Sequence, residues 1–276
     1  MGCVEVRHVS FAYGGASPLL CDLDFCVPDG SFFSILGPSG GGKTTLLRLL
    51  AGLLRPCAGS VVCAGREVLA PGRDRAIVFQ QGGLFPWLTA LGNVAFAASK
   101  THPGMSRKEC RSLASSMLDR VGLSQDMNKW PVQLSGGMRQ RVSIARALAM
   151  ETQVLLMDEP FSALDYKNRC LLQDLLGELW LASHKTVIFV THDIDEALLL
   201  SDSILFLDGT RNMPAMAVPY PQPRARSLLT TTAFCELRRH FIALFNREHS
   251  PLGISADQLL SLRDQASGQG IQSGEE

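Results

Sequence analysis

The sequence contains no segment of the kind that spans or crosses a membrane. None of its apolar runs approaches the length of about 18 residues that a membrane helix requires. Residues 1–6 also lack the basic stretch and apolar core that mark a secretory signal. These absences predict a cytosolic protein, and a hydrophobic content of 46% over 276 residues is ample for a globular core.

Cysteine pairs and an excess of one charge are absent as well. The eight cysteines are scattered without a C-x-x-C pair, which disfavours a zinc site and a disulfide framework. The 26 Lys and Arg residues balance 26 Asp and Glu residues, so the composition does not support a general nucleic-acid binder or a binder of acidic lipids. A role on nucleic acid would need a local basic patch.

One glycine-rich segment stands out against this background. It matches the pattern G-x-x-x-x-G-K-[ST], and its residues are Gly37, Pro38, Ser39, Gly40, Gly41, Gly42, Lys43, Thr44 and Thr45. An apolar run at 31–36 predicts a buried strand before it, and a leucine-rich stretch at 46–54 predicts a helix after it. Glycines let backbone N–H groups surround phosphate oxygens, while Lys43 supplies a cation and Thr44 a hydroxyl for magnesium. The segment therefore predicts a phosphate-binding loop for a nucleoside triphosphate.

Strand and helix signals alternate along the rest of the chain. Short β-rich segments precede the phosphate loop, and a hairpin-like pair follows at 59–68. Helical periodicity dominates 89–149, and strand signals return at 154–157, 186–190 and 203–207. This alternation predicts an α/β fold around a mostly parallel sheet. Beyond 208, prolines indicate a linker-like run, followed by an amphipathic helix that includes Phe234, Leu237, Phe241, Leu244 and Phe245.

Two acidic residues, Asp158 and Glu159, directly follow the apolar strand predicted at 154–157. A strand end holds carboxylates rigidly beside a phosphate loop. Asp158 therefore suits a magnesium ion, and Glu159 suits the attacking water, whose proton it would accept. The plainer alternative is a pair of solvated acids at a strand-to-turn boundary.

A serine and two glycines open another predicted helix. Ser135 is placed to cap this helix, and Gly136 and Gly137 leave its first turn bare, so the helix end can hold an anion. An ordinary helix cap is the alternative.

The order of these motifs resembles that of ABC transporter ATPases. The phosphate loop is followed by Gln80, the Leu-Ser-Gly-Gly motif, the Asp-Glu pair, a Ser-Ala-Leu-Asp motif ending at Asp165, and His192. The resemblance implies a P-loop NTPase fold with a RecA-like core, an antiparallel β edge subdomain and a helical subdomain. It divides the chain into a nucleotide-binding domain at 3–208 with a helical insert at about 84–150, a C-terminal extension at 209–265 and a tail at 266–276 that we expect to be disordered.

The resemblance also implies roles across a dimer. In the family, the residues matching Ser135, Gly136 and Gly137 reach across a head-to-tail dimer to the γ-phosphate of the partner's nucleotide. Asp165 resembles the aspartate that links the two sites. The chain has Met138 where the commonest family motif has Gln, a change that many importer members share.

Further roles fall on single residues near the phosphates. Gln80 resembles the glutamine that senses magnesium and the attacking water, with Gln81 as the alternative. His192 resembles the histidine that touches the γ-phosphate, and Asp193 and Glu196 are able to cap the helix after it. Tyr13 resembles the aromatic residue that stacks on adenine, although Phe11 could be the stacking residue or both could be core. The predicted catalytic residues are thus Glu159, His192 and Gln80, and the predicted magnesium ligands are Thr44, Gln80 and Asp158.

Residues 84–90 place bulky apolar groups near a turn, where the family docks a short helix of the membrane subunit; the core of the helical insert is the alternative. More narrowly, the chain is similar to importers of nitrate, sulfonates and taurine. The resemblance implies an ATP- and Mg²⁺-dependent subunit, peripheral on the cytoplasmic face of the membrane. Its implied partners are a second ATP-binding subunit, with a homodimer favoured, a separate permease and, indirectly, an extracytoplasmic solute-binding protein, but no nucleic acid.

Two other functions fit the sequence less well. A soluble ABC ATPase acting on ribosomes or DNA typically has two cassettes or a long coiled-coil insertion, whereas only 98 positions separate Gly37 from Ser135. A non-catalytic subunit that keeps ATP as a structural ligand is disfavoured because Glu159 and His192 are both present. The sequence does not identify the solute, since selectivity in such systems resides in the permease and the binding protein.

Overall fold

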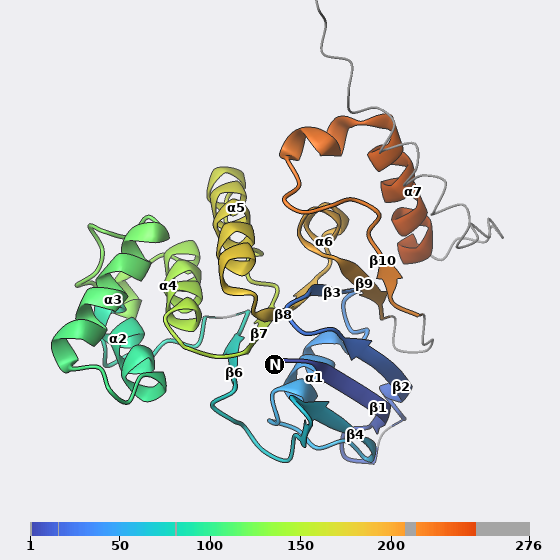
Figure 1. Ribbon diagram of the computed structural model, residues 1–276, viewed down its shortest axis with the longest axis horizontal. Helices are drawn as coiled ribbons and strands as arrows, with labels where there is room; N and C mark the ends of the chain where they lie inside the picture. Colours follow the sequence, from blue (N-terminus) through green and yellow to red (C-terminus); the bar gives the residue numbers. More distant parts are fainter. Residues whose placement is uncertain (1, 16, 81, 208–213, 247–276) are drawn as a thin grey trace, which may run out of the picture.

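The computed structural model describes residues 2–15, 17–80, 82–207 and 214–246, which form two β-sheets with helices around them (Figure 1). The smaller sheet is antiparallel, with strand order β2-β1-β4-β5. Its strands are β1 (Val4–Phe11), β2 (Leu20–Val27), β4 (Ala58–Cys63) and β5 (Arg66–Glu67). Along β2, buried apolar residues such as Leu23 and Phe25 alternate with exposed ones, as expected for a sheet with one face on the core.

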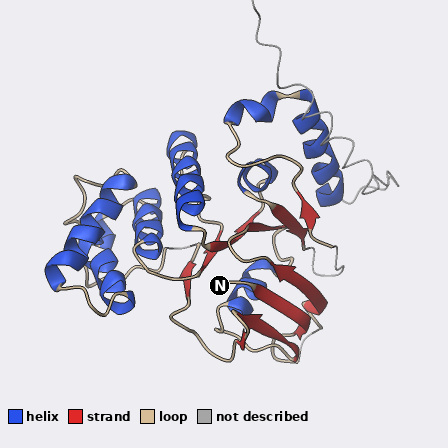
Figure 2. Ribbon diagram, in the orientation of Figure 1, coloured by secondary structure: helices blue, strands red, loops and turns tan. Residues whose placement is uncertain are grey.

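The larger sheet has six strands in the order β10-β9-β3-β8-β7-β6 and crosses the centre of the molecule (Figure 2). All neighbouring pairs are parallel except β10 and β9. Strands β3, β7 and β8 are buried along their whole length, which is typical of parallel strands covered on both faces. The six strands are β3 (Phe32–Leu36), β6 (Arg75–Val78), β7 (Val154–Asp158), β8 (Thr186–Thr191), β9 (Ser203–Phe206) and β10 (Met216–Ala217). The predicted α/β fold with a mostly parallel sheet is confirmed.

Three helices contact one another and lie together at the left of Figure 1: α2 (Ala90–Thr101), α3 (Arg107–Arg120) and α4 (Gly136–Leu148). The start of α3 is fixed by a capping box, in which Ser106 and Glu109 each accept a hydrogen bond from the other's backbone N–H. The remaining elements are the helices α1 (Lys43–Leu50), α5 (Tyr166–Ser183), α6 (Ile194–Leu200) and α7 (Thr232–Asn246) and the 3-10 turns η1 (Pro131–Gln133) and η2 (Arg226–Thr230).

Three apolar cores fix these elements relative to one another. One joins α2–α5 to the larger sheet through residues such as Phe161 and Phe189. A second packs α1 between the two sheets, with Leu46 and Leu47 fully buried. The third lies between α6, β9 and the C-terminal elements β10 and α7. The phosphate loop thus precedes a helix, α1, that the second core holds in place.

The first helix is shorter than its leucine pattern predicts. It ends at Leu50, and Leu53 is exposed. Gly52 adopts φ 75° and its N–H donates to Leu49 O, a left-handed turn that stops helices and is adopted at low cost by glycine.

The proline-rich run after β9 is packed, which differs from the predicted linker. Within it, β10 pairs with β9, and Val218 and Tyr220 are buried in the third core. The predicted amphipathic helix forms as α7, with Phe234, Leu237 and Phe241 buried. The boundary at 208/209, the side chains of Leu244 and Phe245, and the tail at 266–276 lie outside what the structure describes.

Candidate functional site

The larger sheet brings four predicted site segments to one edge, because parallel strands all end on the same side. Across the sheet the strands follow the order β3, β8, β7, β6, which differs from their order in the chain. The phosphate loop follows β3, and His192, Glu159 and Gln80 follow β8, β7 and β6. Glu159 is therefore placed between His192 and Gln80.

The phosphate loop is closed by its own lysine. Lys43 Nζ donates to Gly37 O and Pro38 O, both at 2.8 Å, and burial lowers the pKa of Lys43. A Cβ at Gly37 would lie 1.9 Å from Leu207 O, so the close approach of these strand ends requires glycine. At the start of α1, unpaired N–H groups and the helix dipole favour an anion.

Thr44 connects the phosphate loop to the acids at the end of β7. Thr44 Oγ1 donates to Asp158 Oδ1 at 3.1 Å, and Asp158 is only 4% exposed. Burial raises the pKa of Asp158, so a neighbouring cation would stabilise its ionised form. One carboxylate and one hydroxyl beside a phosphate loop fit Mg²⁺, which is commonly held by one or two carboxylates together with substrate phosphates.

Glu159 is fixed on both sides by residues predicted to act with it. Its Oε2 accepts a hydrogen bond from Gln80 Nε2 at 3.2 Å, and its Oε1 lies 3.2 Å from His192 Nδ1. Its N–H donates to Val190 O at 2.9 Å, and its φ of 43° is uncommon for a residue other than glycine. Such backbone conformations cluster at functional sites, where the surrounding structure maintains them.

The remaining loop residues are placed along the turn into α1. Ser39 and Gly40 are exposed, whereas Gly41, Gly42 and Thr45 are buried. Gln81, the alternative to Gln80, lies outside the described residues.

The structure separates the two candidates for adenine stacking. Phe11 is 7% exposed and belongs to the second core, whereas Tyr13 is 45% exposed. The centroids of the Phe11 and Tyr13 rings lie 4.8 Å apart in a T-shaped arrangement, and Tyr13 Oη lies 3.1 Å from Thr45 Oγ1. Of the two rings, Tyr13 is therefore the one that is accessible beside α1.

The Ser135 motif is placed against a different part of the chain. Ser135 caps α4 by accepting from Met138 N at 3.2 Å, and a Cβ at Gly137 would lie 3.2 Å from Ala163 O. Asp165, two residues further on, caps α5 by accepting from Asn168 N at 3.0 Å. Within the ranges that the structure describes, no hydrogen bond or ion pair links Ser135, Gly136 or Asp165 to the phosphate loop of the same chain.

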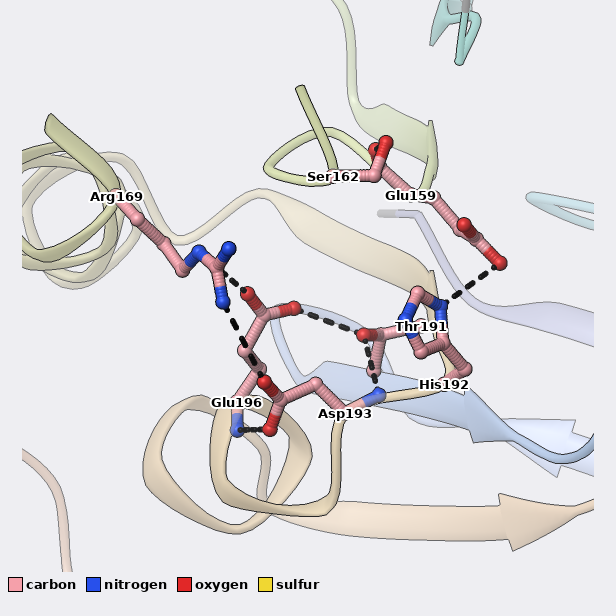
Figure 3. Close-up of a pocket in the computed structure, with 7 residues that line it drawn as sticks. All are labelled: Glu159, Ser162, Arg169, Thr191, His192, Asp193 and Glu196. Carbon is pink, nitrogen blue, oxygen red and sulfur yellow. Dashed lines mark hydrogen bonds and ion pairs between the residues drawn. The ribbon is translucent and has the colours of Figure 1, made fainter. Parts of the chain in front are cut away.

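A small pocket beside His192 is lined by Glu159 and His192 together with residues that the sequence does not predict to belong to the site (Figure 3). Asp193 caps α6 as predicted, accepting from Asp195 N and Glu196 N. The capping role of Glu196 is wrong: its carboxylate accepts from Thr191 Oγ1 at 2.8 Å and from Gln173 Nε2 at 3.1 Å. The pocket is lined by Glu159, Ser162, Arg169, Thr191, His192, Asp193 and Glu196.

The sequence contained one usable signal for this network. A threonine at the end of a buried strand and a glutamate in the first turn of the next helix are five residues apart. A helix start beside a strand end allows such side chains to meet. The identity of the third member, Gln173 on α5, depends on how α5 packs against α6.

The buried Glu196 predicts a dependence of stability on pH. Burial raises the pKa of Glu196 from its ordinary value of 4.5 to about 7. The folded protein therefore binds more protons than the unfolded chain between these values, and the stability that this supplies is lost as the pH rises through about 7. Because each pKa unit is worth about 1.4 kcal/mol, the melting temperature of the wild type should fall relative to Glu196→Gln by about 5 °C between pH 5 and pH 8.

The exposed Glu178 on α5 offers a matched control. Glu178→Gln should follow the wild-type pH dependence in differential scanning fluorimetry. Parallel curves for the wild type and Glu196→Gln would contradict a raised pKa at Glu196.

Comparison with known proteins gives consistent matches. A family model described as "ABC transporter" matches residues 20–162. The aliphatic sulfonates import ATP-binding protein SsuB of a Mycobacterium species is 44% identical over 240 residues, which cover 87% of this chain and 92% of that protein. The bicarbonate transport ATP-binding protein CmpD of a Synechocystis species is 41% identical over 88% of this chain and 89% of its own length. The nitrate transport protein NasD of Klebsiella oxytoca is 40% identical over 90% and 97%.

Some relatives are longer than this chain, which spans 38% of the bicarbonate transport ATP-binding protein CmpC of Synechococcus elongatus. Among solved structures, a dimeric ATP-binding cassette in a post-hydrolysis state with ADP and Pi has a TM-score of 0.72 and 34% identity. The match covers 78% of this chain and 98% of the chain in the solved structure. This agreement confirms the P-loop NTPase fold predicted from the motifs.

Proposed function

Because the chain belongs to the ABC transporter family and is an ATP-binding ATPase, we propose that it is the ATP-hydrolysing subunit of an importer for a small solute of the nitrate, sulfonate or taurine class. Relatives at about 40% identity are named for nitrate, bicarbonate and aliphatic sulfonates. These names support a nitrate-like or sulfonate-like solute without selecting one. We propose that residues 3–208 form the nucleotide-binding domain and that residues of about 84–150 form its helical insert.

The observation that supports hydrolysis most directly is the placement of Glu159. Its carboxylate contacts both Gln80 and His192, and the adjacent Asp158 is bonded to Thr44 in the phosphate loop. Four strands of one sheet thus hold together the residues proposed as the base, the phosphate-contacting histidine and the cation ligands.

Each of these residues has a separate part in the proposed reaction. Lys43 and the N–H groups at the start of α1 bind and orient the phosphates. Thr44 and Asp158, with Gln80, would hold Mg²⁺, which neutralises charge that develops on the phosphate oxygens. Glu159 orients the attacking water and accepts its proton, and His192 donates to the γ-phosphate. Tyr13 stacks on adenine.

The remaining predicted residues act across a dimer in this proposal. Ser135, Gly136 and Gly137 cap the nucleotide of a second subunit, and Asp165 links the two sites. Two findings support it: among the described residues no hydrogen bond or ion pair joins the motif to its own phosphate loop, and the similar solved cassette is dimeric. A homodimer is the simplest arrangement.

The segment after Gln80 is the proposed contact with a permease. Trp87 is 67% exposed, and its ring lies 5.4 Å from Phe85, which in turn lies 5.2 Å from Phe96. An exposed aromatic cluster suits a protein interface. Across the described ranges, no helix has the length and apolar character needed to cross a membrane. We therefore propose a separate permease, with this subunit bound at the cytoplasmic face of the membrane.

Co-purification from native membranes tests the proposed function. The tagged chain should retain a membrane protein with several spans, and Trp87→Ala should weaken that complex while ATP binding is unchanged. Recovery with ribosomes or DNA instead would favour a soluble ABC ATPase. Identification of the co-purified permease and of its binding protein would then define the solute class.

A further inference from the structure

The C-terminal segment from β10 to α7 forms hydrogen bonds with both ends of α6, the short helix that follows His192. At its C-terminal end, Arg224 donates to Leu198 O at 2.8 Å and to Ser201 O at 2.6 Å. These are among the carbonyls that a helix end leaves without helical partners, and a cation there also complements the helix dipole. In the first turn, Arg238 of α7 forms a double hydrogen bond with Asp195, at 2.6 and 2.9 Å.

A third arginine connects the C-terminal elements to α5. Arg226 Nη2 lies 2.7 Å from Cys170 O and 2.9 Å from both Gln173 Oε1 and Asp174 Oδ1. Because Arg226 donates a hydrogen bond to Gln173 Oε1, the amide group of Gln173 is oriented with its Nε2 toward Glu196. A glutamine with only one partner could rotate by 180° and exchange its donor and acceptor.

The fixed Gln173 continues the chain of hydrogen bonds to the end of β8. Gln173 Nε2 donates to Glu196 Oε1 at 3.1 Å, and Thr191 Oγ1 donates to Glu196 Oε2 at 2.8 Å. Thr191 Oγ1 in turn accepts from Asp193 N at 3.0 Å. The two bonds of Thr191 hold the backbone on both sides of His192 (Figure 3). Gln173, Thr191 and Glu196 are each less than 10% exposed, so water competes little with them.

We propose that Arg226 is a positioning residue for His192, which it acts on through Gln173, Glu196 and Thr191, and that η2 thereby contributes to the hydrolytic machinery. The inference rests on the proposed role of His192. It assigns to η2 the support of one loop of the site, in addition to the packing that the C-terminal elements supply.

The test measures steady-state ATP hydrolysis by the full-length chain. Arg226→Ala should lower kcat about tenfold, because small displacements of a catalytic group cost up to about a hundredfold. The KM for ATP should stay within about twofold, since the phosphate loop and Tyr13 are not part of the path. Arg226→Lys, which can still donate to Gln173 Oε1, should restore most of the activity.

A second variant tests the same path without altering the C-terminal elements. Gln173→Met keeps the volume of the buried side chain and removes both hydrogen bonds, so it should lower kcat to a similar extent. The double variant Arg226→Ala/Gln173→Met should be no slower than the slower single variant, because both substitutions interrupt one path. If the double variant instead lowers kcat by the product of the two single-variant factors, the substitutions act independently and the proposal is overturned.

Arg238→Ala is the matched control. It removes another arginine bond between the C-terminal elements and α6 but leaves the path to Thr191 intact, so kcat should stay within about twofold of the wild type. Equal losses of melting temperature in Arg226→Ala and Arg238→Ala, with kcat unchanged in both, would show that Arg226 only stabilises the fold.

His192→Ala separates failure of this inference from failure of the proposed function. If His192→Ala hydrolyses ATP like the wild type, the role of His192 is wrong and the inference falls with it. If His192→Ala is inactive but Arg226→Ala keeps the wild-type kcat, only the inference is overturned.

Discussion

Glu159→Gln should slow ATP hydrolysis by about 10² to 10⁴, the usual contribution of a positioned base, and should leave ATP binding unchanged. The glutamine keeps the shape of the side chain and can still accept a hydrogen bond from Gln80. It cannot accept a proton from water at neutral pH. Turnover is measured by phosphate release, and binding by fluorescence titration with a labelled ATP analogue.

The same substitution at an exposed position of α5 supplies the control. Glu178→Gln makes an identical chemical change outside the site and should hydrolyse ATP at the wild-type rate. Near-normal turnover of Glu159→Gln would remove the assignment of Glu159 as the base. A loss of ATP binding in that variant would instead indicate that Glu159 supports the nucleotide site as a whole.

Lys43→Ala should weaken ATP binding by about 1.5 to 3 kcal/mol, the range for a lost charge-assisted hydrogen bond, which is about 10- to 150-fold in Kd. The side chain is 5% exposed and folds over the loop onto Gly37 O and Pro38 O, so its ammonium is placed where phosphates would bind. The Kd for ATP is measured by isothermal titration calorimetry.

Folding must be separated from binding in this experiment. Lys43 bonds two backbone carbonyls of its own loop, so the far-UV circular dichroism and the melting temperature of Lys43→Ala should be compared with those of the wild type. Lys108→Ala, at an exposed position of α3, should bind ATP normally. Unchanged affinity in a folded Lys43→Ala would contradict the phosphate-binding role.

The local motifs were determined by the sequence alone. The phosphate loop, the cap at Ser135 and the acids after β7 each depend on residues that are neighbours in the chain, and their physical effects act over one turn or one strand end. The same holds for the mostly apolar strands β3, β7 and β8, which form as predicted. For this reason the α/β class and the start of α4 could be read without coordinates.

Only the tertiary structure decided how distant residues meet. The order β3, β8, β7, β6 places Glu159 between Gln80 and His192, and no local pattern encodes that order, since it results from the packing of the helices on both faces of the sheet. The sequence favours a capping role for Glu196 because Gln173, one of the two partners that turn its carboxylate inward, lies 23 residues away in the chain. The proline-rich run gave no sign of packing either, because Val218 and Tyr220 become core only when α6 and α7 close over them.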